Sequence, residues 1–198
     1  MQSTRFPISF WGPISYYQQY FRSENPIFEV HETYKKQSLR NRAYLLCANG
    51  LFYINIPIVK PFGSKTISKD VLVDFSQNFQ TIQWKSLQTA YHSSPFFEHY
   101  EHDLVPLFFS KKKFLLDHCL QSIEFTSQIL QIPHSFQISE SFHFNYEKDL
   151  LHTFNQKQEN SSIKPYIQVY SDKLPFENDL SILDAIFNLG PLTRNLIC

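Results

Sequence analysis

The chain has 198 residues, enough to bury one sizeable core, and a single domain over residues 1–198 is expected. Its 18 Lys and Arg residues balance its 18 Asp and Glu residues, so no overall positive field would attract nucleic acid or an anionic membrane. Aromatic side chains make up 17% of the sequence, and such a composition argues against disorder.

The cysteines and the hydropathy pattern bear on the compartment. Cys47, Cys119 and Cys198 are far apart and show no metal-ligand spacing, so neither a structural zinc site nor a disulfide framework is expected. The first residues lack the long apolar core of a signal peptide, and no later run is long enough to span a bilayer. We therefore expect a cytoplasmic protein without a membrane span.

The N-terminal segment has the pattern of a strand–helix–strand unit. Arg5–Phe10 predicts a short strand, and Gly12-Pro13 predicts the start of a helix, because proline suits the first helical position. Asn25-Pro26 ends that helix, and Ile27–Val30 predicts a second strand. A connection of this length favours a parallel pair of strands.

A β-hairpin is predicted next. The apolar runs Ala43–Cys47 and Leu51–Ile58 are separated by Ala48–Gly50, and Asn49-Gly50 between such runs is a strong hairpin signal. The sequence therefore predicts an α/β fold with a mixed sheet, in which the parallel unit and the hairpin are combined.

Helices are expected to dominate the second half. Apolar residues at helical spacing predict helices over Phe79–Tyr91, within Phe96–Phe109 and over Leu116–Leu130. Ser181–Asp184 has the form of a capping box, with Asp in place of Glu, and the helix that it opens should end at Gly190.

The densest group of polar side chains is the run His31–Arg42, at the carboxyl end of the second predicted strand. Ligands of α/β sheets bind outside the carboxyl ends of parallel strands. The helix amino terminus at Gly12 favours an anion, and Lys35, Lys36, Arg40 and Arg42 could complete a phosphate or carboxylate site. The alternative is a solvated loop in which acidic neighbours such as Glu29 balance the basic residues.

A proton-transfer role is considered for His31 and Glu32, because histidine titrates near neutrality. The structural alternative for the end of the run is that Arg42 pairs with a carboxylate and Asn41 bonds the turn backbone. The sequence contains no phosphate-binding loop, dinucleotide fingerprint or metal-ligand pattern, so no cofactor and no metal are expected.

Several segments together resemble the WbqC-like protein family, in particular the short form found in Bacteroidetes. The resemblance covers nearly the whole length and is carried by these blocks, in chain order: Phe10–Tyr17, Tyr34–Arg42, Ala48–Gly50 with Ile56-Pro57, Trp84 with Ala90-Tyr91, Ser94–Tyr100, Pro165–Tyr170 and Leu180–Pro191. The chain departs from the family where many members carry an acidic pair, because here the pair is His31-Glu32.

The resemblance implies a role in O-antigen or other surface-polysaccharide biosynthesis, with aminoacyl or glycyl transfer to an amino sugar suggested for some members. Carried onto this sequence, it adds side chains to the predicted site. The substrate-binding set is then Gly12, Tyr34, Lys35, Lys36, Gln37, Arg40, Asn41, Arg42, Tyr166 and Gln168. Asp184 and Asn188 lie four residues apart on one helical face. They are expected to support the site by bonding either the Asn41-Arg42 loop or the Tyr166/Gln168 segment.

Two functions from different classes follow. The first is a transferase that binds an anionic, phosphate- or nucleotide-linked small molecule through the basic residues. The second is a non-catalytic interaction module that recruits a partner through an aromatic surface around Phe96, Phe97 and Tyr100. The second predicts an exposed apolar patch, and the first does not.

Overall fold

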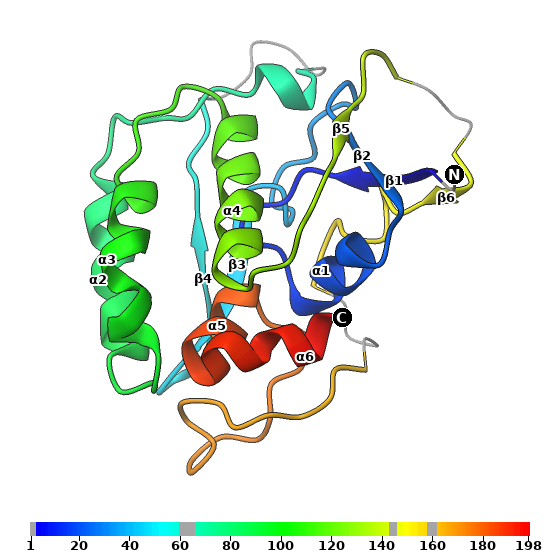
Figure 1. Cartoon of the computed structure of the whole chain (residues 1–198). Coiled ribbons are helices and arrows are strands. Elements are labelled where there is room, and N and C mark those ends of the chain that lie inside the picture. Colours follow the sequence, from blue (N-terminus) through cyan, green and yellow to red (C-terminus); the bar gives the residue numbers. More distant parts are fainter. Residues whose placement is uncertain (1–2, 60–65, 143–145, 158–161) are drawn as a thin grey trace.

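The computed structural model describes residues 3–59, 66–142, 146–157 and 162–198, and it confirms an α/β fold (Figure 1). The strands are β1 (Ser3–Pro7), β2 (Asn25–Glu29), β3 (Arg42–Cys47), β4 (Gly50–Asn55), β5 (Gln137–Ile138) and β6 (Lys148–Asp149). The α-helices are α1 (Ile14–Phe21), α2 (Phe79–Tyr91), α3 (Phe97–Phe108), α4 (Leu115–Ile129), α5 (Ile182–Leu189) and α6 (Arg194–Ile197). Two short 3-10 helices, η1 (Ser68–Asp70) and η2 (Gly190–Thr193), complete the set. No helix in the described ranges is both long and apolar enough to cross a membrane.

The parallel sheet contains the predicted strand–helix–strand unit. Its strand order is β5-β2-β1-β6, and all neighbouring pairs are parallel. Phe6 lies opposite Phe28, and both rings are fully buried together with the Tyr20 ring of α1. Side chains alternate between the two faces of a strand, so Arg5 and Glu29 point away from this aromatic layer.

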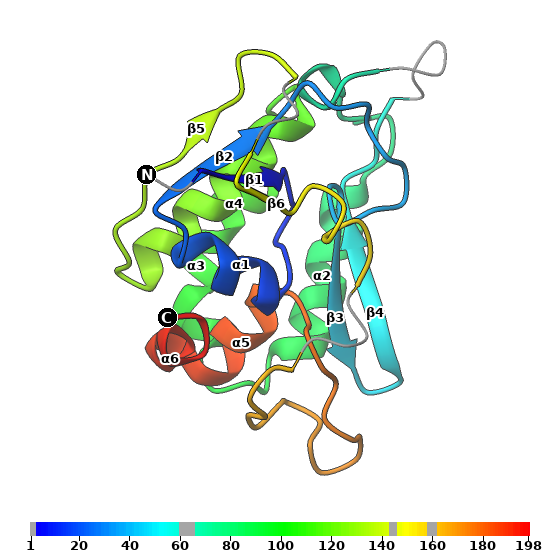
Figure 2. The ribbon, with the colours of Figure 1, turned by 90° about the vertical axis from the view of Figure 1, so that its right-hand side faces the viewer.

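The hairpin is confirmed as an antiparallel pair, with Cys47 opposite Gly50. Gly50 has a φ of 105°, a backbone conformation that glycine adopts without a steric penalty. The hairpin forms a sheet of its own and does not join the parallel one, so the two parts of the predicted mixed sheet are separate. In the parallel sheet, the outer neighbours of β2 and β1 are β5 and β6. Figure 2 shows the hairpin set apart from the parallel strands.

The second half is helical, as predicted, and α5 differs from the prediction in one detail. The Ser181 hydroxyl accepts a hydrogen bond from the Leu183 amide and so caps the helix. Asp184 does not complete the capping box, because its carboxylate is bonded to the hydroxyls of Tyr91 and Tyr166. Gly190 ends α5 with a φ of 56°.

The aromatic run near the start of α3 belongs to the core. Phe97 is fully buried and packs edge to face against Phe187, and Tyr100 is also buried. Trp84 of α2 packs on the other side of Phe97. The exposed aromatic surface that an interaction module would need is therefore absent at this position.

Candidate functional site

The run from His31 to Arg42 leaves the carboxyl end of β2, crosses the molecule and enters β3. A second segment pairs with its first half through backbone hydrogen bonds. The amide of Tyr34 donates to the Thr66 carbonyl, and the amides of Ser68 and Lys69 donate to the carbonyls of Glu32 and Val30, all at 2.9 Å. These bonds hold the side chains of the run and of η1 at one edge of the parallel sheet.

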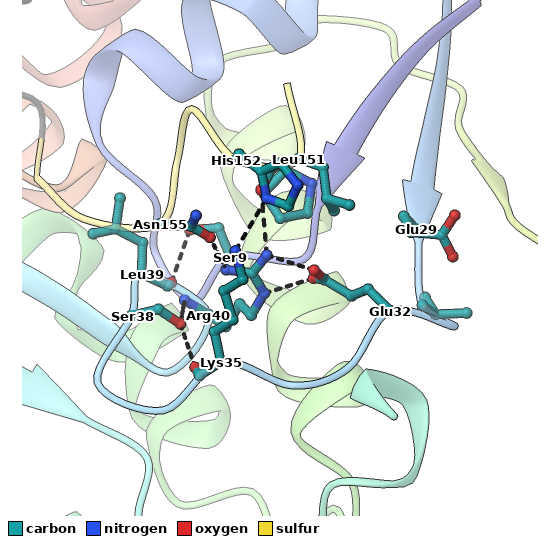
Figure 3. A network of polar contacts seen from close by, with 12 residues as sticks. Ser9, Glu29, Glu32, Lys35, Ser38, Leu39, Arg40, Leu151, His152 and Asn155 are labelled. Carbon is teal, nitrogen blue, oxygen red and sulfur yellow. Dashed lines mark hydrogen bonds and ion pairs between the residues drawn. The ribbon is translucent and has the colours of Figure 1, made fainter. Parts of the chain in front are cut away.

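Arg40 and Glu32 form a buried ion pair in the middle of the run (Figure 3). Arg40 is 0% exposed, and its Nε and Nη2 atoms lie 2.6 and 2.8 Å from the two Glu32 oxygens. The guanidinium also donates to the Asn155 side chain at 2.8 Å and to the Leu151 carbonyl at 3.3 Å. Because each of the three guanidinium nitrogens donates to a partner, Arg40 connects the run to residues 151–155. That role differs from the substrate contact expected for Arg40 and the proton transfer expected for Glu32.

The amino terminus of α1 already holds an anion from the protein itself. The carboxylate of Asp179 accepts hydrogen bonds from the Ser15 amide at 2.8 Å and the Ser15 hydroxyl at 2.6 Å. Gly12 is buried in this turn, and its carbonyl accepts the amide of Ile182. An anionic ligand at Gly12 would have to displace Asp179, so the expected anion site at this helix terminus is filled internally.

His31 takes part in a chain of four side chains that sequence spacing did not predict. The buried carboxylate of Glu29 accepts the Ser139 hydroxyl at 2.8 Å and the His31 amide at 2.8 Å. Ser139 Oγ lies 3.2 Å from His31 Nδ1, and His31 Nε2 lies 2.9 Å from Lys69 Nζ. We call Glu29, Ser139, His31 and Lys69 the relay.

The donor and acceptor assignment of the relay follows from its ends. A lysine ammonium can only donate, so His31 Nε2 accepts and His31 Nδ1 carries the proton toward Ser139. The Ser139 hydroxyl then donates to Glu29. This arrangement fixes one tautomer of a neutral imidazole and connects it to a buried carboxylate, which would stabilise a proton arriving at Nε2.

Three lysines of the run and of η1 have no acidic partner among the residues that the structure describes. Lys69 contacts His31, and Lys35 Nζ lies 3.1 Å from Nδ1 of His152, also a neutral acceptor. Lys36 is exposed. In the described ranges, no carboxylate lies within ion-pair distance of Lys35, Lys36 or Lys69. Gln37 is exposed beside them and has a φ of 55°.

Buried polar atoms without a partner gather where the run enters β3. Tyr34 Oη, Asn41 Oδ1 and Arg42 Nε have no hydrogen bond to any described residue. Burial raises the pKa of Tyr34, and the charges of Arg40 and Arg42 act against that rise, so the phenol lies near both guanidiniums. Unpaired buried atoms of this kind are rare in proteins and call for a ligand or an ordered water.

The sequence suggested structural roles for Asn41 and Arg42, and the structure shows the contact suggested for Asn41 but not the one suggested for Arg42. Asn41 bonds the backbone as expected, through its Nδ2 to the Ile56 carbonyl at 2.9 Å. Arg42 stacks on the ring of Tyr53 at 4.7 Å and makes no ion pair with a described carboxylate.

Tyr166, Gln168, Asp184 and Asn188 form a separate group at the other end of β3. Tyr91 and Tyr166 donate to the two oxygens of Asp184, and Tyr91 Oη accepts the amide of Leu46. Asn188 donates to the Asp184 carbonyl. Burial raises the pKa of Asp184 to about 6 despite these hydrogen bonds. Leu46 is four residues along β3 from Arg42, about 13 Å in an extended strand, so this group does not join the His31–Arg42 run.

Sequence reasoning missed Glu29, Ser139 and Lys69. Glu29 carries the only available signal, since it is an acid inside the apolar strand β2, and a fully buried carboxylate needs partners. Ser139 and Lys69 are separated from His31 by 108 and 38 residues, so no local pattern could assign them.

Comparison with known proteins gives one family. Residues 6–164 match the model of the WbqC-like protein family. The matched segment contains the run, the relay and most of the helices. No curated protein matches the chain. No solved structure matches it either.

Proposed function

The chain belongs to the WbqC-like protein family, and from the geometry of its His31–Arg42 region we propose that it is a cytoplasmic transferase of surface-polysaccharide biosynthesis. Its donor would be an anionic, phosphate- or nucleotide-linked molecule. Its acceptor would be an amine or hydroxyl of a sugar, and aminoacyl or glycyl transfer to an amino sugar is the form that we favour.

The relay is the observation that carries this proposal. The Nε2 atom of His31 accepts from Lys69, while Nδ1 is connected through Ser139 to the buried carboxylate of Glu29. In the proposed reaction, the acceptor nitrogen attacks the acyl or glycosyl carbon of the donor and loses its proton to His31 Nε2. The bond from that carbon to the phosphate oxygen breaks, and the phosphate leaves with the electron pair.

Lys69 has two roles in this scheme. In the structure its ammonium occupies His31 Nε2 at 2.9 Å. An anionic donor would draw Lys69 toward its phosphate, so Nε2 would become free for the acceptor only when the donor is bound. Lys35 and Lys36 would supply the remaining positive charge, since neither is neutralised by a described carboxylate.

The buried position of Phe97 and Tyr100 favours this function over the interaction module. An interaction surface there would require partial unfolding of α3.

Binding of inorganic pyrophosphate and of UDP, measured by isothermal titration calorimetry at low salt, tests the proposal. The wild-type chain should bind at least one of the two, and Lys35→Ala/Lys69→Ala should weaken that affinity by at least tenfold. Lys85→Ala removes an exposed lysine of α2 and should have no effect. No binding of either anion to the wild-type chain, or equal loss in the control, would overturn the proposal.

The proton-transfer role is tested separately. With nucleotide-linked sugars or acyl phosphates as donors and amino sugars as acceptors, product can be followed by mass spectrometry. His31→Gln should keep pyrophosphate or UDP affinity within threefold and lower turnover by about 10²-fold or more, the usual contribution of a general base. His102→Gln, an exposed histidine of α3, is the matched control. Unchanged turnover in His31→Gln would exclude His31 as the base.

A further inference from the structure

The outer edge of β4 is not protected against pairing with another chain. Among the described strands β4 pairs only with β3, and Figure 2 shows β4 at the margin of the molecule. Natural proteins usually protect such an edge with a charged side chain, a proline or a bulge. The sequence of β4 is Gly-Leu-Phe-Tyr-Ile-Asn and its register with β3 is unbroken, so none of these devices is present within the strand. Leu51 and Tyr53 are each 47% exposed, and the edge is therefore accessible to an added strand.

Hydrogen bonds to α2 show which backbone groups of β4 face outward. The N–H and the carbonyl of Asn55 point away from β3, because both are bonded to the side chain of Gln83. In an antiparallel pair, successive residues alternate between facing the partner strand and facing away from it. Leu51 and Tyr53 therefore face outward, as Asn55 does. No described residue bonds the outward groups of Leu51 or Tyr53, so two donors and two acceptors remain along this edge.

Gln83 already binds the last outward position of the edge in the manner of a peptide group. Its Oε1 accepts the Asn55 amide at 2.9 Å, and its Nε2 donates to the Asn55 carbonyl at 2.6 Å. A carboxamide offers the same donor and acceptor as a backbone peptide group. This contact therefore reproduces the two hydrogen bonds that an antiparallel strand would make at Asn55, and it marks where an added strand must end.

A groove of about 410 Å³ lies between the tip of the hairpin and the second half of α2, with Tyr170 at its side. This volume is typical of ligand pockets. Phe52 and Ala90 contribute apolar surface to the groove. The hydroxyls of Ser86, Thr89 and Tyr170 also line it, and each already donates to a backbone carbonyl. The groove therefore suits an apolar side chain.

The groove carries one charge, the ammonium of Lys85. Lys85 is exposed on α2, and no described carboxylate lies within ion-pair distance of its Nζ. None of the described residues that line the groove is acidic. An occupant with a negative charge beside Lys85 would supply the missing counter-charge, whereas a positive occupant would be repelled.

We propose that the outer edge of β4 binds an extended peptide segment of a partner protein, with an apolar side chain in the groove and an acidic side chain beside Lys85. Paired antiparallel to β4, the segment would exchange two hydrogen bonds with Leu51 and two with Tyr53. The peptide residue opposite Phe52 would direct its side chain into the groove, because directly opposed residues share a face of the sheet.

The acidic side chain belongs two positions from the apolar one, since alternate residues of a strand lie on the same face. A second copy of this chain is the other occupant that an open edge admits. Paired through β4, it would bring no acidic side chain from that strand to Lys85, so the charge favours a partner peptide.

The test is an NMR titration of the full chain with the peptide acetyl-Thr-Glu-Val-Leu-Val-Thr-amide. Its glutamate and leucine lie two positions apart, and the valines flank the leucine. The backbone amides of Leu51 and Tyr53 should shift saturably, with the micromolar to millimolar affinity that is usual for so short a ligand. Replacing the leucine of the peptide by aspartate should weaken binding by about tenfold or more, because the apolar groove does not compensate a buried charge. No saturable shift, or equal affinity of the two peptides, would overturn the proposal.

Methylated peptides show whether the peptide binds as an added strand, and they leave the protein unchanged. A methyl group on the nitrogen of either valine removes an N–H that faces β4, and it should weaken binding by about tenfold or more. A methyl group on the nitrogen of the leucine, which faces away from β4, should change the affinity by less than about threefold. Equal effects at the valines and at the leucine would overturn strand addition.

Two lysine variants test the charge. Lys85→Gln should weaken binding of the glutamate peptide by about threefold, the size expected for an exposed ion pair, and should not affect a peptide with glutamine in its place. Lys164→Gln, at an exposed position that does not line the groove, should leave both affinities unchanged. Equal effects of the two variants would overturn the contact assigned to Lys85.

Sedimentation velocity of the chain without peptide identifies the competing occupant. A monomer that binds the peptide supports the proposal, whereas a dimer that excludes the peptide would assign the edge to a second copy and would overturn it. The proposed function fails on a different readout, because pyrophosphate and UDP binding depend on Lys35 and Lys69. Pyrophosphate should therefore not compete with the peptide.

Discussion

The buried pair of Glu32 and Arg40 allows a quantitative test of its structural role. Glu32→Gln keeps the shape of the side chain and removes its charge, which leaves the Arg40 guanidinium, 0% exposed, without a counter-charge. Breaking one side of a buried ion pair costs about 3–5 kcal/mol. With a urea dependence of about 2 kcal/mol per M, the unfolding midpoint should fall by about 2 M.

A double-mutant cycle separates the charge effect from the packing effect. Arg40→Met alone leaves the Glu32 carboxylate buried and should cost a similar amount. The double variant Glu32→Gln/Arg40→Met buries no charge, so it should be more stable than the sum of the single effects implies by about 2 kcal/mol or more. Lys36→Met, at an exposed position of the same run, should change stability by less than about 0.5 kcal/mol.

Urea unfolding monitored by fluorescence and circular dichroism gives all four free energies. A loss below about 1 kcal/mol for Glu32→Gln would show that water reaches the guanidinium and would refute the reasoning. Strict additivity of the two single changes would do the same, because independent sites show no coupling.

Three further changes have expected outcomes that urea unfolding can measure. Because burial raises the pKa of Asp184 from 3.8 to about 6, the folded state retains a proton that the unfolded state releases. Wild-type stability relative to Asp184→Asn should therefore fall by about 3 kcal/mol as the pH rises from about 3 to 7, and a pH-independent difference would contradict this. Gly190→Ala should cost at least about 2 kcal/mol, because the added Cβ would lie 2.5 Å from the Phe96 ring at a φ of 56°, and a cost near zero would show that the ring moves freely. Asp179→Asn keeps the side-chain shape at the start of α1 and should cost about 1 kcal/mol at low salt and less at high salt, whereas a salt-independent cost would rule out the helix-dipole contribution.

The parts of the fold that sequence predicts are those with local signals. Gly12-Pro13 marks the start of the first helix, and Asn49-Gly50 marks the hairpin, so both units were expected with nearly the observed bounds. β6, at Lys148–Asp149, has two residues and therefore no periodicity to detect. It exists because Arg5, on the neighbouring strand, binds the Asp149 carboxylate across 144 residues, and no local pattern encodes that contact.

The candidate site differs, because its contacts are not encoded by adjacency in the sequence. A proton-transfer role is considered for His31 or Glu32, which are neighbours in the sequence. In an extended segment, however, consecutive side chains point to opposite sides. His31 therefore faces Ser139 and Lys69, whereas Glu32 faces Arg40. The carboxylate that His31 uses is Glu29, two residues earlier and on the same side of the chain.

The internal contacts of the acidic residues explain how a chain with zero formal net charge presents lysines without a described acidic partner on the run and on η1. Glu29 and Glu32 are buried, where Arg5 forms an ion pair with Glu29 and Arg40 binds Glu32. The more exposed Asp149 is also bound by Arg5. The lysines of the run and of η1 lack described acidic partners, because the nearby carboxylates are consumed by these internal contacts. Net charge thus excludes a global attraction for nucleic acid but not a local anion site. It follows that pyrophosphate affinity should fall steeply with added salt, and an affinity that does not change with salt would contradict a local site built on these lysines.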